Sequence, residues 1–246
     1  MKPTAEHAEI QRRYFVEADA ERFRWTTDAP GFAETEDELL VSILPDLSPP
    51  CLELGCGEGN NLVRLVRHVR CVGIDLFPNK LKFAARELPA VPFAAADASA
   101  LPFVDGAFGS VFIRDLLHHV PEPERVLAEA VRVLRPEGRL HVLEPNGRNP
   151  IVNLQTRLVP AEAEARHSGT ARIEKLLRAQ PLDGVRAWTT QPLPFRRLVL
   201  HYRFGMPAVG RIAPARRALA LTERVLGGLL PRSRWAYVAA VGTRRR

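Results

Sequence analysis

The sequence predicts an α/β fold built on a doubly wound, mostly parallel sheet. Short apolar runs alternate with helical stretches from residue 51 onward, and three glycines follow the first run in CLELGCGEGN (51–60). Apolar strands between helices are typical of a parallel sheet that is covered on both faces. Clustered glycines after the first strand let the backbone bend sharply at the edge where such sheets bind ligands. The length of 246 residues suits a single domain spanning 1–246.

The N-terminal part, residues 1–44, is predicted to be helical. Residues 4–24 place apolar side chains near helical spacing, and the segment TTDAPGF then interrupts them. The segment ETEDELLVSILPDL (34–47) opens with acids, where the helix dipole favours them, and a proline and the SPP that follow end it.

Residues 45–150 form the predicted core, in which strands and helices alternate. Strands are expected at five apolar runs: CLEL (51–54), CVGID (71–75), VPFAAAD (91–97), SVFIRDL (110–116) and RLHVLEP (139–145). Helices are expected between them at NNLVRLVRHV (60–69), NKLKFAARE (79–87) and EPERVLAEAVRVL (122–134).

The alternation loosens after residue 145. A helix is expected at TARIEKLLRAQ (170–180) and a strand at GVRAWTT (184–190). Residues 190–232, which include the apolar-striped segment 213–230, are predicted to be a helical insertion before a last, seventh strand within 233–243.

The charge is unevenly distributed along the chain. Residues 1–150 carry 17 Lys+Arg and 23 Asp+Glu, which gives −6, whereas residues 151–246 carry 18 and 5, which gives +13. A basic C-terminal third can attract an anionic substrate, a lipid surface or a nucleic acid. Arginines that only decorate solvated helix faces are an equally good explanation, because no aromatic residues are interleaved with them in a basic stripe.

Cysteine usage and hydropathy bear on the compartment. The three cysteines, Cys51, Cys56 and Cys71, lie in or beside predicted buried strands without the spacing of a metal site. They suit small buried thiols in a reducing cytoplasm, and no metal is expected. The sequence contains no apolar run long enough to cross a bilayer and no signal-like N-terminus. We therefore expect a cytoplasmic protein.

The glycine segment indicates a nucleotide ligand. Asp75 ends the second predicted strand, 18 residues after Gly57, which is the spacing of an acid that accepts from a ribose. The spacing here is G-x-G-x-G, and Asn60 occupies the third-glycine position of the dinucleotide fingerprint, which weighs against an NAD-dependent dehydrogenase. Glu53 would repel a pyrophosphate but suits an ammonium group. These features point to S-adenosylmethionine.

Ordered segments of the chain resemble class I S-adenosylmethionine-dependent methyltransferases. LELGCGEGN resembles their first motif, GIDLFP their ribose-binding segment, and AADASALPF their adenine-binding segment. The stretch FGSVFIRDLLHHVPEPERVLAEAVRVLRPEGRL resembles their fourth strand, the helix after it and the turn that follows. The similarity covers about residues 45–146 and the last strand, within a small-molecule group that includes ubiquinone/menaquinone-type C-methyltransferases. It implies a Rossmann-like, seven-stranded sheet with an antiparallel last strand and a lid of N-terminal helices.

The resemblance also implies roles for individual residues. Residues from Glu53 to Gly59 should line the methionine moiety, Asp75 the ribose, and Leu76, Asp97 and Ala98 the adenine. Tyr14 of the lid is expected near the cofactor carboxylate. Arg114 departs from the family, which often has a small or apolar residue there, so either its backbone alone matters or its side chain holds an anionic group. The full cofactor set expected is Tyr14, Glu53, Gly55, Cys56, Gly57, Gly59, Asn60, Asp75, Leu76, Asp97, Ala98 and Arg114.

Three residues are candidate proton acceptors for the methyl transfer. On a helix, His118 and His119 would point about 100° apart and could not both face one site, which argues against a metal held by both. One of them is expected to stay in the core and the other to face the substrate as a general base. Asp115 is a second candidate, and Glu144 and Asn146 follow the fifth strand at the substrate edge.

The methyl acceptor is open at this point. A soluble small molecule, with an oxygen, nitrogen or carbon acceptor atom, is the first expectation. A lipid or quinone acceptor, with the basic insertion in peripheral contact with a membrane, is the alternative. RNA is a weaker candidate, because there is no appended RNA-binding module. A cofactor binder that has lost catalysis is a further alternative, and the oligomeric state is not predicted.

Overall fold

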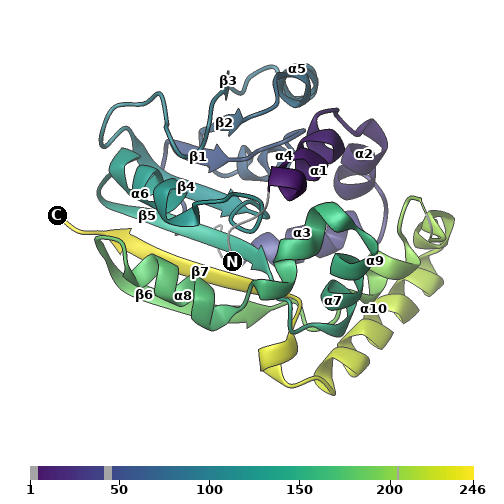
Figure 1. Cartoon of the computed structure of the whole chain (residues 1–246). Helices are drawn as coiled ribbons and strands as arrows, with labels where there is room; N and C mark the ends of the chain where they lie inside the picture. Colours follow the sequence, from purple (N-terminus) through teal and green to yellow (C-terminus); the bar gives the residue numbers. More distant parts are fainter. Residues whose placement is uncertain (1–4, 42–45, 204) are drawn as a thin grey trace.

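The fold is a seven-stranded mixed sheet flanked by helices (Figure 1). The computed structural model describes residues 5–41, 46–203 and 205–246. The strand order is β3-β2-β1-β4-β5-β7-β6, and neighbours are parallel except β7, which is antiparallel to β5 and β6. This confirms the predicted fold class. The strands are β1 (Cys51–Leu54), β2 (Cys71–Asp75), β3 (Phe93–Ala95), β4 (Phe108–Arg114), β5 (Leu134–Pro145), β6 (Leu182–Thr190) and β7 (Tyr237–Arg244).

The central strands are buried on both faces, which is why they read as apolar runs. Every residue of β1 and of β4 is buried. Leu52 and Leu54 belong to one hydrophobic cluster and Cys51 to another, so the two sides of β1 contribute to separate cores. The single acid within β1, Glu53, therefore has to serve something other than packing.

Helices cover the two faces of this sheet. They are α4 (Leu62–Leu65), α5 (Pro78–Glu87), α6 (Pro123–Val133) and α8 (Thr170–Arg178). The proline at the start of α6 suits the first turn, where a missing N–H removes no hydrogen bond. Val126, Leu127 and Ala130 of α6 recur at helical spacing and pack into the larger core. The helix expected over 60–69 is shorter than predicted.

Three helices precede the sheet and lie at the carboxyl end of its parallel strands (Figure 1). They are α1 (Ala5–Phe15), α2 (Ala20–Thr27) and α3 (Ala33–Leu40). The single helix expected over 4–24 is wrong, because Asp19 accepts a hydrogen bond from the Arg22 N–H at 2.9 Å and so begins a new helix. Part of the second predicted helix, residues 42–45, lies outside the described residues.

Apart from α8 and β6, the segments between β5 and β7 gather at the same end of the sheet (Figure 1). They are α7 (Pro150–Leu158), a 3₁₀ segment (Pro160–His167), α9 (Phe195–Val199), a 3₁₀ segment (Pro207–Arg211), α10 (Ala213–Gly228) and a 3₁₀ turn (Arg232–Arg234). The helical insertion before the last strand is thus present, whereas α7 and the 3₁₀ segment after it were not predicted. Within the described part of the chain, no helix has the length and apolar character to cross a membrane.

The lid helices pack directly on the insertion. The Trp25 ring stacks on Phe32, with 3.7 Å between ring centroids, and its Nε1 donates to the Leu200 carbonyl at 2.7 Å. Arg196 pairs with Glu38 of α3 at 2.6 Å. Two regions far apart in the sequence therefore form one layer over the carboxyl edge of the sheet.

Candidate functional site

The loop after β1 is held in a conformation that only glycines adopt easily. Gly55, Gly57 and Gly59 have φ angles of +69°, +54° and +87°. A Cβ on Gly59 would also meet Leu88 at 3.1 Å. The loop therefore turns tightly after β1, in a backbone conformation that side chains at these three positions would strain.

Asp75 at the end of β2 fixes this loop. Its Oδ2 accepts from the Gly57 N–H and its Oδ1 from the Phe77 N–H, both at 2.9 Å. Burial raises the pKa of Asp75, because it disfavours the charged carboxylate, and the two backbone hydrogen bonds offset part of this effect. Each carboxylate oxygen keeps a second lone pair, so Asp75 can still accept from a ligand hydroxyl.

Glu53 stands at the centre of the site with half of its carboxylate unsatisfied. Its Oε1 accepts from Asn61 Nδ2 at 2.6 Å, while its buried Oε2 has no hydrogen-bond partner among the described residues. Burial raises the pKa of Glu53 to about 8. A buried, unpaired carboxylate oxygen is unfavourable unless a donor is bound there, and an ammonium group is the donor that would also restore its charge.

Asn61 links Glu53 to Arg114. Arg114 Nη1 donates to Asn61 Oδ1 at 2.8 Å and pairs with Glu36 Oε2 of α3 at 2.7 Å. The buried Arg114 side chain therefore acts within the protein, where it holds the lid helix α3 and orients the amide that binds Glu53. Asn60, which the sequence analysis places in the expected cofactor set, precedes Asn61 in this loop. Its side chain donates to Thr26 Oγ1 at 2.6 Å and so connects the loop to α2.

A second ionic group beside the loop was missed by the sequence reasoning. Glu58 Oε1 accepts from the Asp19 N–H at 3.1 Å and lies 3.6 Å from Lys80 Nζ, and Arg22 Nη2 lies 3.7 Å from Glu58 Oε2. Burial lowers the pKa of Lys80. The sequence did contain a signal for this ion pair. An acid lies between two glycines, and a lysine lies on the apolar face of α5.

Phe15, the residue after Tyr14, contacts two side chains beside the glycine loop and the histidine turn. The Phe15 ring is 5.0 Å from Lys80 Nζ and 4.8 Å from the His119 ring. Tyr14 is half-exposed, and its ring contacts that of Phe15.

The segments expected to hold an adenine lie further along the same edge. Asp97 is exposed, and its Oδ1 accepts from the Ser99 N–H at 2.7 Å in a turn. Leu76 is exposed, and Ala98 packs against the larger core. Cys56 is buried, and burial raises the pKa of its thiol, which is therefore neutral.

The expectation that His118 and His119 point apart is wrong. They lie in a turn after β4 rather than in a helix, and their ring centroids are 3.9 Å apart. Glu144 makes this turn by accepting from the Leu116 and Leu117 N–H groups at 2.9 and 2.8 Å. One nitrogen of each ring and one oxygen of Glu162 lie within 4.8 Å of one another, a spacing that a metal ion would also accept.

His118 is held between two carboxylates. Its Nδ1 is 2.6 Å from Glu144 Oε2 and its Nε2 is 3.3 Å from Glu162 Oε2. Burial alone would lower its pKa, but the two acids raise the pKa of His118 to about 10, and the hydrogen bond from His118 in turn lowers the pKa of Glu162 to about 2. His118 is therefore a buried imidazolium that ties the turn to the 3₁₀ segment after α7.

His119 and Asp115 occupy more open positions. Nδ1 of His119 is 3.0 Å from Gln11 Nε2 of α1, and its Nε2 is 3.9 Å from Glu162. Asp115 has a positive φ of 51° and accepts from the Tyr237 hydroxyl at 3.2 Å. Burial raises the pKa of Asp115. Asn146, in contrast, is structural, because its amide donates to the Ser233 and Trp235 carbonyls.

Residues 52–142 match a family model described as a methyltransferase domain. They are a class I methyltransferase domain. The match spans the part of the chain from β1 to β5 that contains the glycine loop, Asp75 and the histidine turn. It confirms the resemblance inferred from the sequence motifs.

Curated relatives extend the similarity beyond this methyltransferase domain. The chain is 33% identical over 211 residues to an uncharacterized 37.1 kDa protein in transposon TN4556 of Streptomyces fradiae, covering 82% of this chain and 56% of that protein. It is 34% identical over 126 residues to a demethylmenaquinone methyltransferase of Renibacterium salmoninarum, covering 49% and 51%. It is 33% identical over 170 residues to phthiotriol/phenolphthiotriol dimycocerosates methyltransferase 1 of Mycobacterium ulcerans, covering 65% and 59%. The chain thus spans between about half and three-fifths of these relatives.

Solved structures agree on the fold of the methyltransferase domain and its surroundings. Phosphoethanolamine N-methyltransferase 2 of Haemonchus contortus, solved with S-adenosyl-L-methionine, superposes with a TM-score of 0.69 at 16% identity. The superposition covers 99% of this chain and 61% of that one. At this level of identity the likeness concerns the fold alone.

Proposed function

We propose that this protein transfers a methyl group from S-adenosylmethionine to an oxygen, nitrogen or carbon atom of a small organic acceptor, with S-adenosylhomocysteine as the second product. One observation carries the proposal. The buried Oε2 of Glu53 has no hydrogen-bond partner among the described residues, and it lies beside a glycine loop with three positive φ angles. An ammonium group such as that of the methionine moiety satisfies this oxygen and favours the ionised carboxylate.

The remaining residues around the loop suit the same cofactor. In our proposal Gly55, Cys56, Gly57 and Gly59 contribute the loop backbone, and Asn60 and Asn61 hold the loop against α2 and Glu53. Asp75 accepts from the ribose while it keeps its two backbone hydrogen bonds. Leu76, Asp97 and Ala98 border the adenine, and Tyr14 and Phe15 belong to the lid. Arg114 contributes indirectly, through Asn61 and Glu36.

The chain mainly has to position the acceptor and exclude water. When bound, S-adenosylmethionine supplies a methyl group on a sulfonium that is already a good leaving group. Orientation of two reactants in a closed site is worth roughly 7 to 11 kcal/mol. The layer formed by α1–α3 and the insertion supplies this closure over the carboxyl edge of the sheet.

We propose His119 as the proton acceptor where the acceptor atom carries a proton. His118 is less suited, because it already holds a proton between Glu144 and Glu162 and is completely buried. His119 is partly exposed, and its Nδ1 faces the Gln11 amide of the lid, a position that an acceptor hydroxyl could take. Asp115, beside Tyr237, is the alternative acceptor of the proton.

A hydrophobic acceptor of the quinone or lipid type is the second candidate. It is supported by the two relatives named above, one a demethylmenaquinone methyltransferase and one a dimycocerosate methyltransferase. We place the reaction in the cytoplasm, where the buried free thiols of Cys51, Cys56 and Cys71 are maintained.

Two measurements test the proposal in order. Titration calorimetry should show binding of S-adenosylhomocysteine and none of NAD, and the reverse would indicate a dehydrogenase. Labelled methyl from S-adenosylmethionine is then followed into aqueous and organic fractions of an extract from the source organism. Label in the aqueous fraction identifies a small soluble acceptor, and label in the organic fraction a quinone or lipid. Cofactor binding without any transfer would contradict the enzymatic role.

Within the same assay, His119→Ala should reduce turnover at least about 100-fold if His119 is the general base. His119→Gln, which keeps a polar side chain in contact with the lid, should be equally impaired. Full turnover of both variants would remove His119 from the chemistry and leave Asp115, tested by Asp115→Asn.

A further inference from the structure

Helix α10 presents an apolar stripe to solvent. Leu221, Val225 and Leu229 follow one another at intervals of four residues along α10 and the residue after it, so they lie on one face. Their side chains are 61%, 57% and 77% exposed. A helix of a globular protein normally turns such a stripe toward the core.

The orientation of α10 is fixed by its opposite face, so the stripe cannot simply rotate inward. Glu223, two residues after Leu221 and therefore about 200° around the helix, is buried and pairs with Arg196 at 3.2 Å. Gly227 is buried as well, and a Cβ there would meet Pro192 at 2.5 Å. On this side, Arg216 also pairs with Glu34 of α3 at 3.3 Å.

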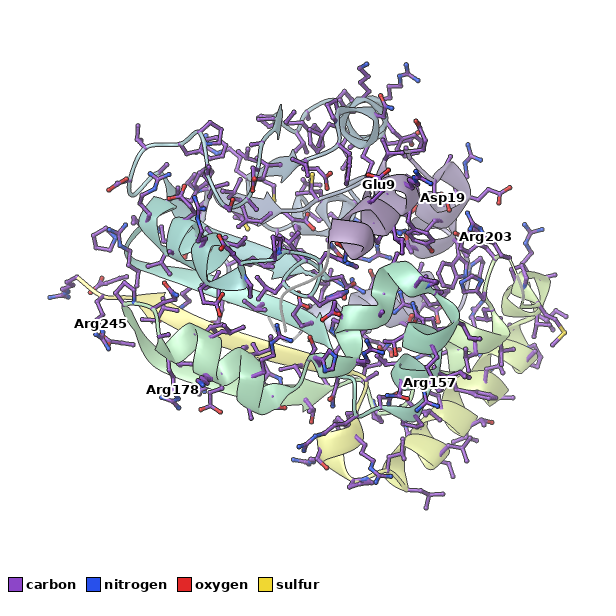
Figure 2. All side chains as sticks on the ribbon, in the orientation of Figure 1. Glu9, Asp19, Arg157, Arg178, Arg203 and Arg245 are labelled. Atoms are coloured by element: carbon purple, nitrogen blue, oxygen red, sulfur yellow. The ribbon has the colours of Figure 1, made fainter. Side chains whose placement is uncertain are left out.

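Arginines are frequent in the part of the chain that contains the stripe. Residues 196–234 contain nine arginines and one acid, Glu223, which is buried against Arg196. Arg217 and Arg224 are exposed and flank the stripe on α10 itself. Further exposed arginines precede and follow the helix; they are Arg203, Arg211, Arg232 and Arg234. Figure 2 shows Arg203 at the same end of the molecule as α10, beside Asp19, to which it is bound at 2.7 Å.

Further exposed apolar side chains lie before the helix and on it. Met206 and Ile212, in the segment leading into α10, are both more than half exposed, and Leu226 is exposed on the helix. Apolar side chains that are flanked by cations, on a helix whose other face is anchored, form the pattern of an interfacial membrane helix. We define the α10 face as Leu221, Val225 and Leu229 with Arg217 and Arg224.

We propose that the α10 face docks on the surface of an anionic lipid bilayer. The arginines are attracted by the lipid head groups, and the leucine and valine side chains enter the boundary of the acyl chains. A nucleic acid would match the charge but not the exposed apolar stripe at its centre. A protein partner would need acidic residues arranged around an apolar centre. An anionic bilayer offers charged head groups and an apolar interior at every point of its surface.

Docking at this face would bring the acceptor side of the protein to the membrane. Leu200, just after α9, accepts from Trp25 of the lid, and Arg197 of α9 donates to the Tyr237 hydroxyl, which contacts Asp115. The docked segment is therefore joined to the lid and to the proposed acceptor site. The docking inference itself does not rest on methyl transfer, because vesicle binding can be measured without cofactor or acceptor.

The test is co-sedimentation of the full chain with vesicles of phosphatidylcholine alone or mixed with phosphatidylglycerol. Binding is expected only to the mixed vesicles and should weaken as salt is raised. The variant Leu221→Ser/Val225→Ser/Leu229→Ser should bind at least about tenfold more weakly, since its apolar insertion is removed. Arg217→Glu/Arg224→Glu should weaken binding about 25-fold or more, because each arginine near an anionic surface is worth about fivefold.

Matched controls place the same chemical changes elsewhere. Val104→Ser changes an exposed apolar residue far along the chain, and Arg125→Glu reverses an exposed arginine on α6. Both should bind as the unmodified protein does. Unchanged melting temperatures show that the variants are folded, as expected for exposed positions.

Three outcomes would overturn the proposal. The first is no binding to mixed vesicles at low salt. The second is full binding by the triple serine variant, which would indicate a purely electrostatic site of the kind that binds nucleic acid. The third is a dimer in solution that the triple serine variant converts to a monomer, because the stripe would then be covered by a second copy.

Discussion

Replacement of Glu53 by glutamine tests two consequences of its unpaired carboxylate oxygen. The first is a loss of stability at high pH, and the second is a gain in affinity for the cofactor. Glutamine keeps the size of the side chain and an oxygen for Asn61, but it cannot ionise. In the unliganded protein the pKa of Glu53 is raised from 4.5 to about 8. One pKa unit corresponds to about 1.4 kcal/mol, so the ionised carboxylate lowers the free energy of unfolding by about 3 to 5 kcal/mol above pH 8.

The sign follows from proton counting. Between about pH 4.5 and pH 8 the native state holds a proton on Glu53 that the unfolded chain has lost, so stability falls as pH rises. The stability of the Glu53→Gln variant does not fall in this way, because glutamine has no proton to lose. We expect equal melting temperatures at about pH 4 and a variant that melts about 6 °C or more above the unmodified protein at pH 9, since 1 kcal/mol shifts the melting temperature of a domain of this size by about 2 to 4 °C.

Cofactor binding should change in the opposite direction. A hydrogen bond to a charged group contributes about 1.5 to 3 kcal/mol, so the variant should bind S-adenosylhomocysteine about 10- to 150-fold more weakly in calorimetry at pH 8. The two measurements together define the role of Glu53. Equal affinity of both proteins, or a melting difference that does not grow between about pH 4 and pH 9, would refute the reasoning.

Three further substitutions test other parts of the site. Asp75→Asn places an amide N–H₂ against a backbone N–H, so it should weaken S-adenosylhomocysteine binding at least about tenfold in calorimetry; unchanged affinity would remove Asp75 from the site. His118→Gln should lower the free energy of unfolding by about 3 to 5 kcal/mol, because Glu144 and Glu162 lose their buried cation. Since the pKa of His118 is raised, this loss should be largest below about pH 6.5 and vanish as pH rises through about 10, and a denaturation series that shows no such trend would contradict the ion pair. Gly59→Ala should lower stability by about 1 to 2 kcal/mol in the same denaturation assay, because its φ of +87° is strained for alanine, and an unchanged midpoint would show that the loop relaxes.

The cofactor half of the fold was predictable because its strands are buried on both faces. Leu52, Val111 and Leu140 lie side by side in β1, β4 and β5, and each is completely buried. Such strands have to be apolar throughout, and the glycines and Asp75 that follow them have fixed places at the carboxyl edge. Local sequence was therefore enough for this region.

Helix α7 was missed although its sequence signal was present. Asn149 Oδ1 accepts from the Ile151 and Val152 N–H groups at 3.0 and 3.2 Å, and Pro150 occupies the first helical position. No helix was predicted at this point, although an asparagine followed by proline and apolar residues is a helix start.

The histidine turn could not be predicted from local sequence. Its shape comes from Glu144, which lies 26 residues or more from the residues it binds, and from the positive φ of Asp115. The ion pair of Glu58 with Lys80 likewise depends on how α5 packs on the glycine loop. Contacts between segments decide such geometry, and no local pattern encodes them.

The insertion has a narrow base. The Ala236 N–H donates to the Gln191 carbonyl at 2.8 Å, so residues 192–235 leave and rejoin the β6–β7 pair one hydrogen bond apart. From the viewpoint of the sheet, α9 and α10 are a single long hairpin loop, and lengthening a loop adds little free energy beyond closing it. Evolution, or a designer grafting a different segment between Gln191 and Ala236, can therefore change what the protein attaches to and accepts while the glycine loop and Asp75 stay in place.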